Sequence, residues 1–293
     1  MTVMFFFDNH YRPLRLRGRS PETSRLYRIS IRHFDETMGR DAVLTDLTNE
    51  NINRHLQRIR DKGRAPATVN KDLSQLGAIW RFASRHGHVG NWPEVRKEIE
   101  PKRVPMAWTP QEVRQLLATI EAMAGMLGNV AERSFWGAIV RLCLDTGERI
   151  GAVRVAQWDW LNDDWLIVPA ESRKGKTRDR AYQLSPHTME LLGELRKAAI
   201  GSTIFYFPRE PGYLWRRLAH IQAKAGLPVD RRSKWHRMRR TVATAVHASG
   251  GDAQAAMDHS SRKTTDSYID PRATKTVANS SVVTDYLGIG KAG

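Results

Sequence analysis

Two arginines, two histidines and a tyrosine occur at positions where they could act together on a phosphodiester. His236 and Arg239 are three residues apart, so a helix would place them on one face. His259 follows this pair, Tyr268 lies nine residues further on, and Arg149 lies far upstream at the end of an apolar run. Such a set can neutralise a phosphodiester, move protons around it and attack it without a metal ion.

The two arginines suit the binding of the phosphate. A phosphodiester resists nucleophiles because its oxygens are anionic, and a guanidinium matches those oxygens with parallel hydrogen bonds and stays charged. Arg149 and Arg239 would also stabilise the charge that grows in a pentacoordinate transition state. Arg149 follows Thr146 and Gly147, where a helix is expected to stop, so its side chain would extend from a helix end. A single arginine of this kind is more often a surface residue, and only the set favours the functional interpretation.

The histidines and the tyrosine suit proton transfer and attack. His236 can relay a proton or donate to a non-bridging oxygen, and His259 can donate to the same phosphate. A structural histidine is the ordinary alternative for each of them. Tyr268 stands in a short polar segment with few apolar neighbours, whereas a packing tyrosine normally belongs to an apolar stripe. This context favours a reactive phenol.

A departing 5′-hydroxyl needs a proton, and a basic turn at residues 172–178 offers two lysines for this role. Lys174 and Lys176 both fit, because the pKa of a lysine responds readily to burial and to nearby charge. A turn that merely contacts phosphate is the alternative.

The bulk composition favours a polyanionic partner and excludes several classes of site. The 293 residues include 47 Lys and Arg against 31 Asp and Glu, a net charge of +16. The alternative is a basic protein with no nucleic-acid role. The lone Cys143 excludes an internal disulfide and a cysteine-based zinc site. No stretch approaches the ~18 apolar residues that span a bilayer, so we expect a soluble intracellular protein with no membrane partner.

The sequence of the N-terminal third of the chain predicts a helical DNA-binding domain. Residues 1–19 are expected to form a basic arm, residues 20–92 a compact helical domain, and residues 93–105 a linker bounded by prolines. Within the domain, one helix follows the Ser-Pro pair at its start, a second follows Thr48, and a third begins near Thr68. The basic positions of this domain expected to face DNA are Arg54, Arg58, Arg64, Lys71 and Arg81.

The sequence of the rest of the chain predicts a mostly α catalytic domain over residues 106–271 and a tail over residues 272–293. A capping box at Thr109 opens the domain, and strands are expected at residues 158–168 and 181–184 on either side of the basic turn. The predicted fold class is therefore mainly α, with a helical first domain and a mixed, mostly α second domain that carries a small antiparallel sheet.

In their order and intervals these motifs resemble those of the tyrosine recombinases, especially the phage integrases. Residues 146–150 are similar to the first arginine box of that family, residues 236–240 to its His-x-x-Arg box, and residues 258–268 to the segment that leads to the nucleophile. The turn with Lys174 sits where the family places its lysine, and residues 20–90 resemble its core-binding helical domain. Any single box is weakly specific, but the ordered set is strongly specific.

The sequence departs from the family pattern at three places. Ala152 stands where the family often has a glutamate three residues after the first arginine. Met257 and Asp258 replace the usual Leu-Gly pair before the second histidine. The hairpin is a residue longer than is common, and of the two lysines we favour Lys174 over Lys176.

The resemblance implies a site-specific recombinase whose two domains clamp duplex DNA. Tyr268 would attack the phosphate held by the arginines and histidines and form a 3′-phosphotyrosyl bond, while Lys174 would protonate the departing 5′-hydroxyl. The covalent bond retains the phosphoester energy, so no ATP, metal or other cofactor is expected. Four protomers on two sites would exchange strands in pairs, with an accessory DNA-bending or directionality factor as a further partner. We expect the protein in the cytoplasm of a bacterial or phage-infected cell, associated with the nucleoid.

Two alternatives use the same family features. One is a catalytically inactive DNA-binding relative, which predicts a gap in the catalytic set. The other is a type IB-like topoisomerase, which acts on supercoiled DNA without a specific site. A metal-dependent nuclease needs clustered carboxylates, and Asp163-Asp164 is the only adjacent acidic pair near the expected site. The tail carries an apolar patch of Val282, Val283, Tyr286 and Leu287, which would dock onto a neighbouring protomer or close its own domain. Further residues expected to contact DNA in the second domain are Lys176, Arg178 and Arg240.

Overall fold

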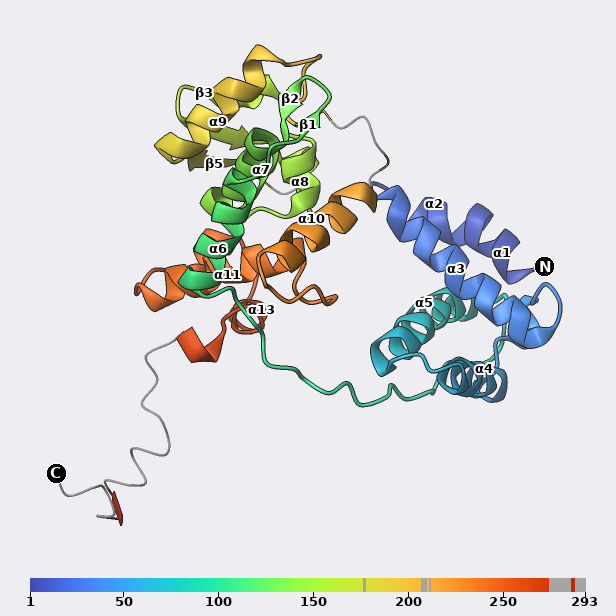
Figure 1. Cartoon of the computed structure of the whole chain (residues 1–293). Helices are drawn as coiled ribbons and strands as arrows, with labels where there is room; N and C mark the ends of the chain where they lie inside the picture. Colours follow the sequence, from blue (N-terminus) through green and yellow to red (C-terminus); the bar gives the residue numbers. More distant parts are fainter. Residues whose placement is uncertain (176–177, 207–209, 211, 274–285, 288–293) are drawn as a thin grey trace. The chain divides into compact units, whose positions relative to one another are not determined.

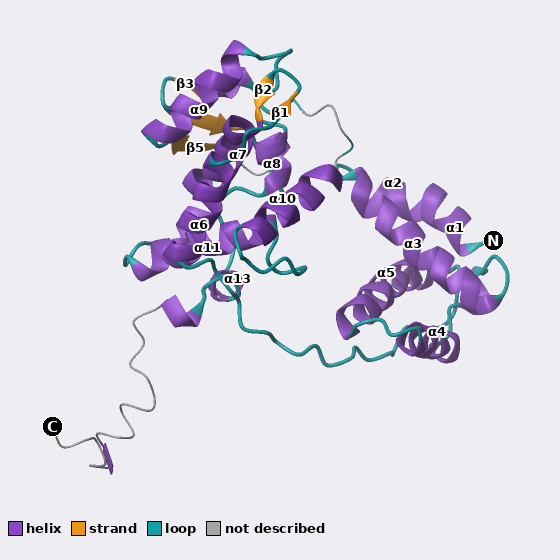
Figure 2. Cartoon of the chain, in the orientation of Figure 1, coloured by secondary structure: helices purple, strands orange, loops and turns teal. Residues whose placement is uncertain are grey.

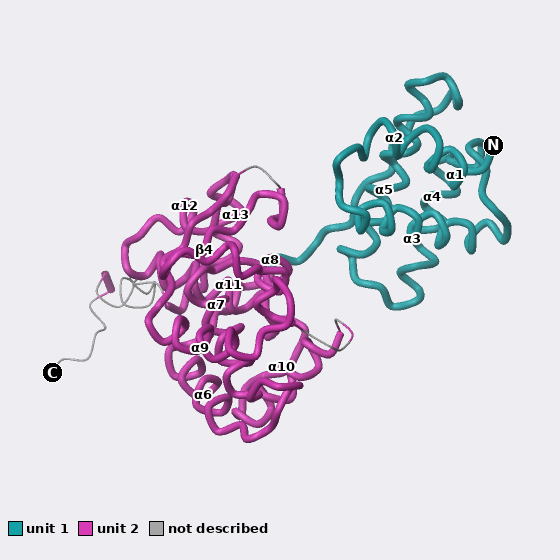
Figure 3. Tube along the Cα trace, turned by 90° about the horizontal axis from the view of Figure 1, so that it is seen from above, with its two compact units in different colours: residues 1–102 teal, residues 103–293 magenta. Residues whose placement is uncertain are grey.

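The computed structural model consists of two compact units, Met1–Lys102 and Arg103–Gly293 (Figure 3). Helices predominate and the strands are few and short (Figure 2), which confirms the predicted mainly α fold class. None of the described helices is long and apolar enough to cross a lipid bilayer. The residues that the structure describes are 1–175, 178–206, 210, 212–273 and 286–287.

The first unit is a set of helices (Figure 1), and an aromatic and aliphatic core lies between them. Helix α3 begins after Ser20, whose hydroxyl accepts a hydrogen bond from the Glu22 amide, and α4 is capped in the same way by Thr48. Ile31, Ile52 and similar side chains are buried where α3, α4 and α5 pack together. The helices of this unit are α1 (Val3–Phe6), α2 (Arg12–Arg15), α3 (Pro21–Met38), α4 (Asn49–Asp61) and α5 (Pro66–Arg85).

The N-terminal segment corrects the expectation of a basic arm at residues 1–19. Phe6, Phe7 and Tyr11 are buried in the core of the first unit, on a helical path in which a π-turn joins α1 to α2. The Phe7 ring stacks on that of Tyr27 with centroids 5.3 Å apart. The aromatic side chains therefore turn inward while the arginines of this segment stay exposed, and the burial of apolar area orders the segment.

The second unit is built around helix α7, which is buried along most of its length. Helices α6, α9 and α11 pack against it (Figure 1). The capping box expected at Thr109 is present and opens α6. The helices of this unit are α6 (Pro110–Glu121), α7 (Glu132–Thr146), α8 (Ile150–Arg154), α9 (Pro186–Lys197), α10 (Gly212–Lys224), α11 (Trp235–Ala248), α12 (Ala253–Met257) and α13 (Arg262–Asp266).

A three-stranded antiparallel sheet in the second unit carries the basic turn. Its strands β3 (Leu161–Asn162), β4 (Trp165–Val168) and β5 (Arg180–Gln183) pair in sequence order. The strand expected over residues 158–168 is thus divided, because a tight turn with Asp163 at φ 51° separates β3 from β4. A small hairpin of β1 (Met126–Leu127) and β2 (Val130–Ala131) was not predicted, since strands of two residues are too short to show an alternating pattern.

Candidate active site

The turn between α7 and α8 delivers the first arginine. Gly147 ends α7 in a left-handed conformation with φ 63°, and a Cβ placed there would lie 2.7 Å from the Met257 side chain. The backbone angle therefore favours glycine, and any larger residue would have to displace the end of the flexible Met257 side chain. The chain reverses at this point, and Arg149 becomes the N-cap residue of α8 with a half-buried side chain.

The second arginine joins three separate segments of the unit. Arg239 lies on α11 and is only 2% exposed. Its Nη1 donates to the Gly147 carbonyl at 2.6 Å, and its Nη2 donates to the Met257 carbonyl. Burial, together with the positive charge of Arg149, lowers the pKa of Arg239. The guanidinium thus connects the turn after α7 to the end of α12. Arg149 and Arg239 also line the same cavity.

The tyrosine ring lies between the two imidazoles. The Tyr268 ring centroid is 4.6 Å from that of His259 and 5.0 Å from that of His236. The Arg239 guanidinium carbon is 5.8 Å from the centre of the same ring. Tyr268 follows α13, and its amide donates to the Thr265 carbonyl at 2.8 Å. Three other predicted residues therefore lie around the Tyr268 ring.

His259 is held by contacts at both ring nitrogens. Its Nε2 is 3.3 Å from Arg239 Nη2, and its Nδ1 is 3.1 Å from the Thr265 hydroxyl. Because the arginine can only donate, Nε2 accepts, so Nδ1 carries the proton and donates to Thr265. The ring orientation is set by these two partners before any substrate binds.

Both imidazoles are uncharged at neutral pH. Burial first, and then the positive charges of Arg239 and Arg149, lower the pKa of His259 to about 4. The pKa of His236 is also lowered to about 4, by the protein atoms packed around the ring and then by nearby cations that include Lys174. This holds although part of the His236 ring is exposed to solvent. A bound phosphate would offset these positive charges and favour protonation.

An open cationic cavity of about 510 Å³ adjoins these residues, and its charge suits an anionic ligand. Lys174 is exposed on the turn before β5, and its charge acts on His236, but among the described residues no direct contact joins it to the other predicted catalytic residues. Lys176 lies outside the described residues. The side chains around the cavity are Arg149, Ile150, Trp215, Arg231, Lys234, Trp235, His236 and Arg239.

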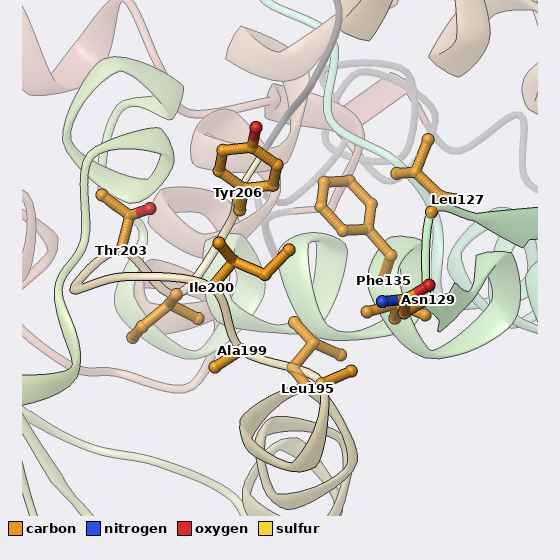
Figure 4. A pocket seen from close by; sticks show the side chains of 12 residues that line it. Leu127, Asn129, Phe135, Leu195, Ala199, Ile200, Thr203 and Tyr206 are labelled. Atoms are coloured by element: carbon orange, nitrogen blue, oxygen red, sulfur yellow. The ribbon is translucent and has the colours of Figure 1, made fainter.

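A second cavity, of about 220 Å³, has a mostly apolar lining (Figure 4). Leu195, Ile200 and Phe135 supply much of its lining, and none of the described residues that line it is charged. None of the predicted catalytic residues borders it. In the described part of the chain, moreover, no group of three or more His, Cys, Asp or Glu side chains is arranged to hold a metal ion.

A buried ionic network next to the site was not predicted from the sequence. Glu148 is 4% exposed, and its Oε1 accepts hydrogen bonds from Arg173 Nε at 2.6 Å and from the Tyr182 hydroxyl at 2.7 Å. Arg173 Nη1 also donates to Asp258 Oδ2 at 2.9 Å. Ala152, where a glutamate was missing from the expected pattern, is buried. A buried carboxylate is therefore supplied by the residue just before Arg149. The only signals of this network in the sequence are Glu148, an acidic residue within the segment 146–150, and Asp258, which departs from the family pattern.

The residues expected to contact DNA in the first unit differ in their availability. Arg54, Arg64 and Arg81 are exposed, and Arg58 is half-buried near Glu36. The Lys71 ammonium lies 2.8 Å from the buried Asp72 carboxylate, which neutralises its charge.

In the second unit, Arg178 is exposed but paired with Asp258, and Arg240 is half-buried. The predicted tail patch lies outside the described residues at Val282 and Val283. Tyr286 and Leu287 are described, and both are exposed.

Comparison with known proteins places the chain among DNA recombinases. Residues 107–275 match the model of the Phage integrase family. The chain is 26% identical to Tyrosine recombinase XerC 2 of Ralstonia nicotianae, over 92% of this chain and 82% of that protein. It is 23% identical to Tyrosine recombinase XerA of Thermococcus kodakarensis, over 87% of this chain and 86% of that protein.

Solved structures share the fold. A lambda integrase tetramer bound to a Holliday junction is similar with a TM-score of 0.72 and 21% identity, over 94% of this chain and 79% of that one. The Tn1549 transposon integrase, residues 82–397, in complex with circular intermediate DNA is similar with a TM-score of 0.68 and 16% identity, over 98% of this chain and 99% of that one.

Proposed function

Because a family match covers more than half of its length, the chain belongs to the Phage integrase family, and we propose that it is a site-specific tyrosine recombinase that cuts and rejoins double-stranded DNA. The observation that supports this most is the convergence at Tyr268, whose ring lies within 5.0 Å of both imidazole rings and near the Arg239 guanidinium. The proposed nucleophile thereby lies close to His236 and Arg239, two of the side chains that line the cationic cavity.

In the proposed reaction the Tyr268 oxygen attacks a phosphorus atom bound by Arg149 and Arg239. The two guanidiniums bind the non-bridging oxygens and stabilise the additional charge of the pentacoordinate transition state. His236, which is neutral because its pKa is lowered to about 4, is available to accept the phenol proton. A 3′-phosphotyrosyl bond forms as the bond to the 5′ oxygen breaks.

Lys174 is the proposed proton donor to the departing 5′ oxygen. It is exposed on the turn before β5, and it is close enough to His236 for its charge to lower the pKa of that imidazole. Attack by the 5′-hydroxyl of a partner strand then reverses the step on a new junction. Arginines supply the positive charge and the phosphotyrosyl bond retains the phosphoester energy, so the proposed reaction requires neither metal nor ATP.

We extend the proposal to the assembly by similarity. The lambda integrase in the similar structure is a tetramer on a Holliday junction, and four copies of this chain on two DNA sites would exchange strands in the same manner. Both units would contact the duplex, with Arg54, Arg64 and Arg81 of the first unit on its phosphates. An accessory DNA-bending factor and association with the nucleoid belong to the same proposal.

The test is covalent trapping on a nicked substrate from which the cleaved strand diffuses away. The wild-type protein should form a covalent adduct, and Tyr268→Phe should form none while it retains DNA binding. Tyr206→Phe is the matched control, because Tyr206 is an exposed tyrosine away from the cationic cavity. An adduct that persists in Tyr268→Phe would remove this residue from its role.

A further inference from the structure

Asp258 adopts a backbone conformation that usually belongs to glycine. Its φ is 53° and its ψ is 47°, in the left-handed region. Among the described residues other than glycine, only Asp163 shares a positive φ, at 51°. Glycine adopts this conformation without steric cost, and it is the usual residue at this position in the family that the sequence resembles. An aspartate at this position suggests that its side chain has a role.

The Asp258 carboxylate binds both ends of the lysine turn. Oδ2 accepts from Arg173 Nη1 at 2.9 Å, and Oδ1 accepts from Arg178 Nε at 2.8 Å and from its Nη2. Arg173 directly precedes Lys174, and Arg178 follows four residues after it. Arg173 Nη1 also donates to the Arg178 carbonyl at 3.1 Å, which closes the base of the turn.

These contacts join the lysine turn to the two segments that hold the phosphate. Asp258 is adjacent to His259, whose Nε2 contacts Arg239. Arg173, the partner of Asp258, also donates to the buried Glu148, which directly precedes Arg149. Arg173 is itself only 6% exposed, so the pairing with both carboxylates takes place away from bulk solvent, where ionic hydrogen bonds are strong.

Lys174 needs such an anchor because the backbone beside it is permissive at Gly175. Gly175, next to Lys174, has φ 103°, a conformation open to glycine alone, and the Lys174 side chain is exposed. A proton donor on a freely moving turn would spend little time at the leaving oxygen, and a displacement of about 1 Å can cost about 100-fold in rate.

We propose that Asp258 is a positioning residue that holds the Lys174 turn beside the phosphate through its ion pairs with Arg173 and Arg178. The inference rests on the proposed function, in which Lys174 protonates the departing 5′ oxygen. It adds a residue that touches neither the phosphate nor the leaving group and acts through the lysine.

The test replaces the bridging 5′ oxygen at the scissile phosphate by sulfur. In the ordinary substrate the P–O5′ bond breaks as the Tyr268 oxygen bonds to phosphorus, and the 5′ oxygen takes a proton from the Lys174 ammonium. In the sulfur substrate the P–S bond breaks and a thiolate leaves. A thiol has a pKa of about 8.5, so the thiolate needs no proton donor.

Asp258→Asn and Asp258→Gly should slow single-turnover cleavage of the oxygen substrate by about 10- to 100-fold. On the sulfur substrate both variants, like Lys174→Ala, should cleave within about threefold of the wild-type rate, because the missing proton donor no longer matters. Asparagine tolerates the left-handed conformation of residue 258, and glycine adopts it without steric cost. Neither replacement therefore strains the backbone at the end of α12. A role in folding alone would slow both substrates equally.

Asp163→Asn and Asp163→Gly are matched controls. Asp163 is an exposed aspartate with almost the same φ, and its side chain forms no ion pair with the lysine turn among the described residues. These variants make the same chemical change without loss of the anchor and should cleave both substrates at the wild-type rate.

Three results would overturn the inference. Wild-type cleavage of the oxygen substrate by the Asp258 variants would show that the anchor is dispensable. If sulfur restores Lys174→Ala but not the Asp258 variants, Asp258 acts on another step. If sulfur fails to restore Lys174→Ala, the assignment of Lys174 as the acid fails and the inference fails with it. Adduct formation that depends on Tyr268 would still support the recombinase in that case.

Discussion

Protonation of His259 should destabilise the folded protein as the pH falls below neutral. Its ring is 8% exposed and lies beside the Arg239 guanidinium, so the folded state favours the neutral imidazole, and its pKa is about 4. The unfolded chain takes up the same proton near the ordinary value of 6.5. Between these two values the unfolded state binds more protons than the folded state, so the free energy of unfolding decreases as the pH is lowered.

The size of this effect follows from the two pKa values. Each pKa unit corresponds to about 1.4 kcal/mol, and the part of the difference between 6.5 and 4 that is realised at about pH 5 amounts to roughly 2 kcal/mol. Solvent in the adjoining cavity screens some of it, so we expect His259 to lower the free energy of unfolding by roughly 1–2 kcal/mol between about pH 7 and about pH 5. His236 acts in the same direction, but its ring is partly exposed.

The measurement is urea unfolding at these two pH values, followed by tryptophan fluorescence, for the wild-type protein and His259→Gln. Glutamine cannot take up the proton, so the variant should lose less stability on acidification, by that same roughly 1–2 kcal/mol. His220→Gln serves as the control for loss of an exposed imidazole. An identical pH dependence in wild type and His259→Gln, or a wild-type protein more stable at the lower pH, would refute the reasoning.

Four further predictions concern the phosphate site and the binding of DNA. Arg149→Ala should slow cleavage by about 100- to 1000-fold, as for loss of a preorganised donor, with little change in the urea midpoint; activity within tenfold of wild type would oppose this role. Arg239→Ala should lose comparable activity and also stability, because the Gly147 and Met257 carbonyls lose their buried donor; an unchanged urea midpoint would contradict the structural part. DNA binding should weaken with salt at a log–log slope of about −0.9 per phosphate contacted, and a flat titration would argue against contacts to the backbone. Cleavage should continue in EDTA, and its loss would show that a metal is needed.

Local signals in the sequence predicted much of the framework. The capping box at Thr109, the N-caps at Ser20 and Thr48, and the apolar stripes depend on residues one or two turns apart, so they are visible before the chain folds. Helix geometry alone also places His236 and Arg239 on one face of α11. The aromatic segment at residues 3–11 differs, because the arginines that follow it favour an exposed arm, whereas the burial of its rings depends on packing against α3 and α5.

The sequence by itself determined the chemical inventory: a phenol, two imidazoles and two guanidiniums in an order that favours phosphoryl transfer. The tertiary structure alone decided which charges meet. Glu148, Arg173 and Asp258 are separated by 25 and 85 residues, and no periodicity links them. Burial makes an unpaired charge costly, so such groups are paired by whichever segments pack together, and that packing is a property of the whole unit. For the same reason the sequence does not predict the lowered pKa values of His236 and His259, which depend first on the burial of the two rings and then on the cations packed around them.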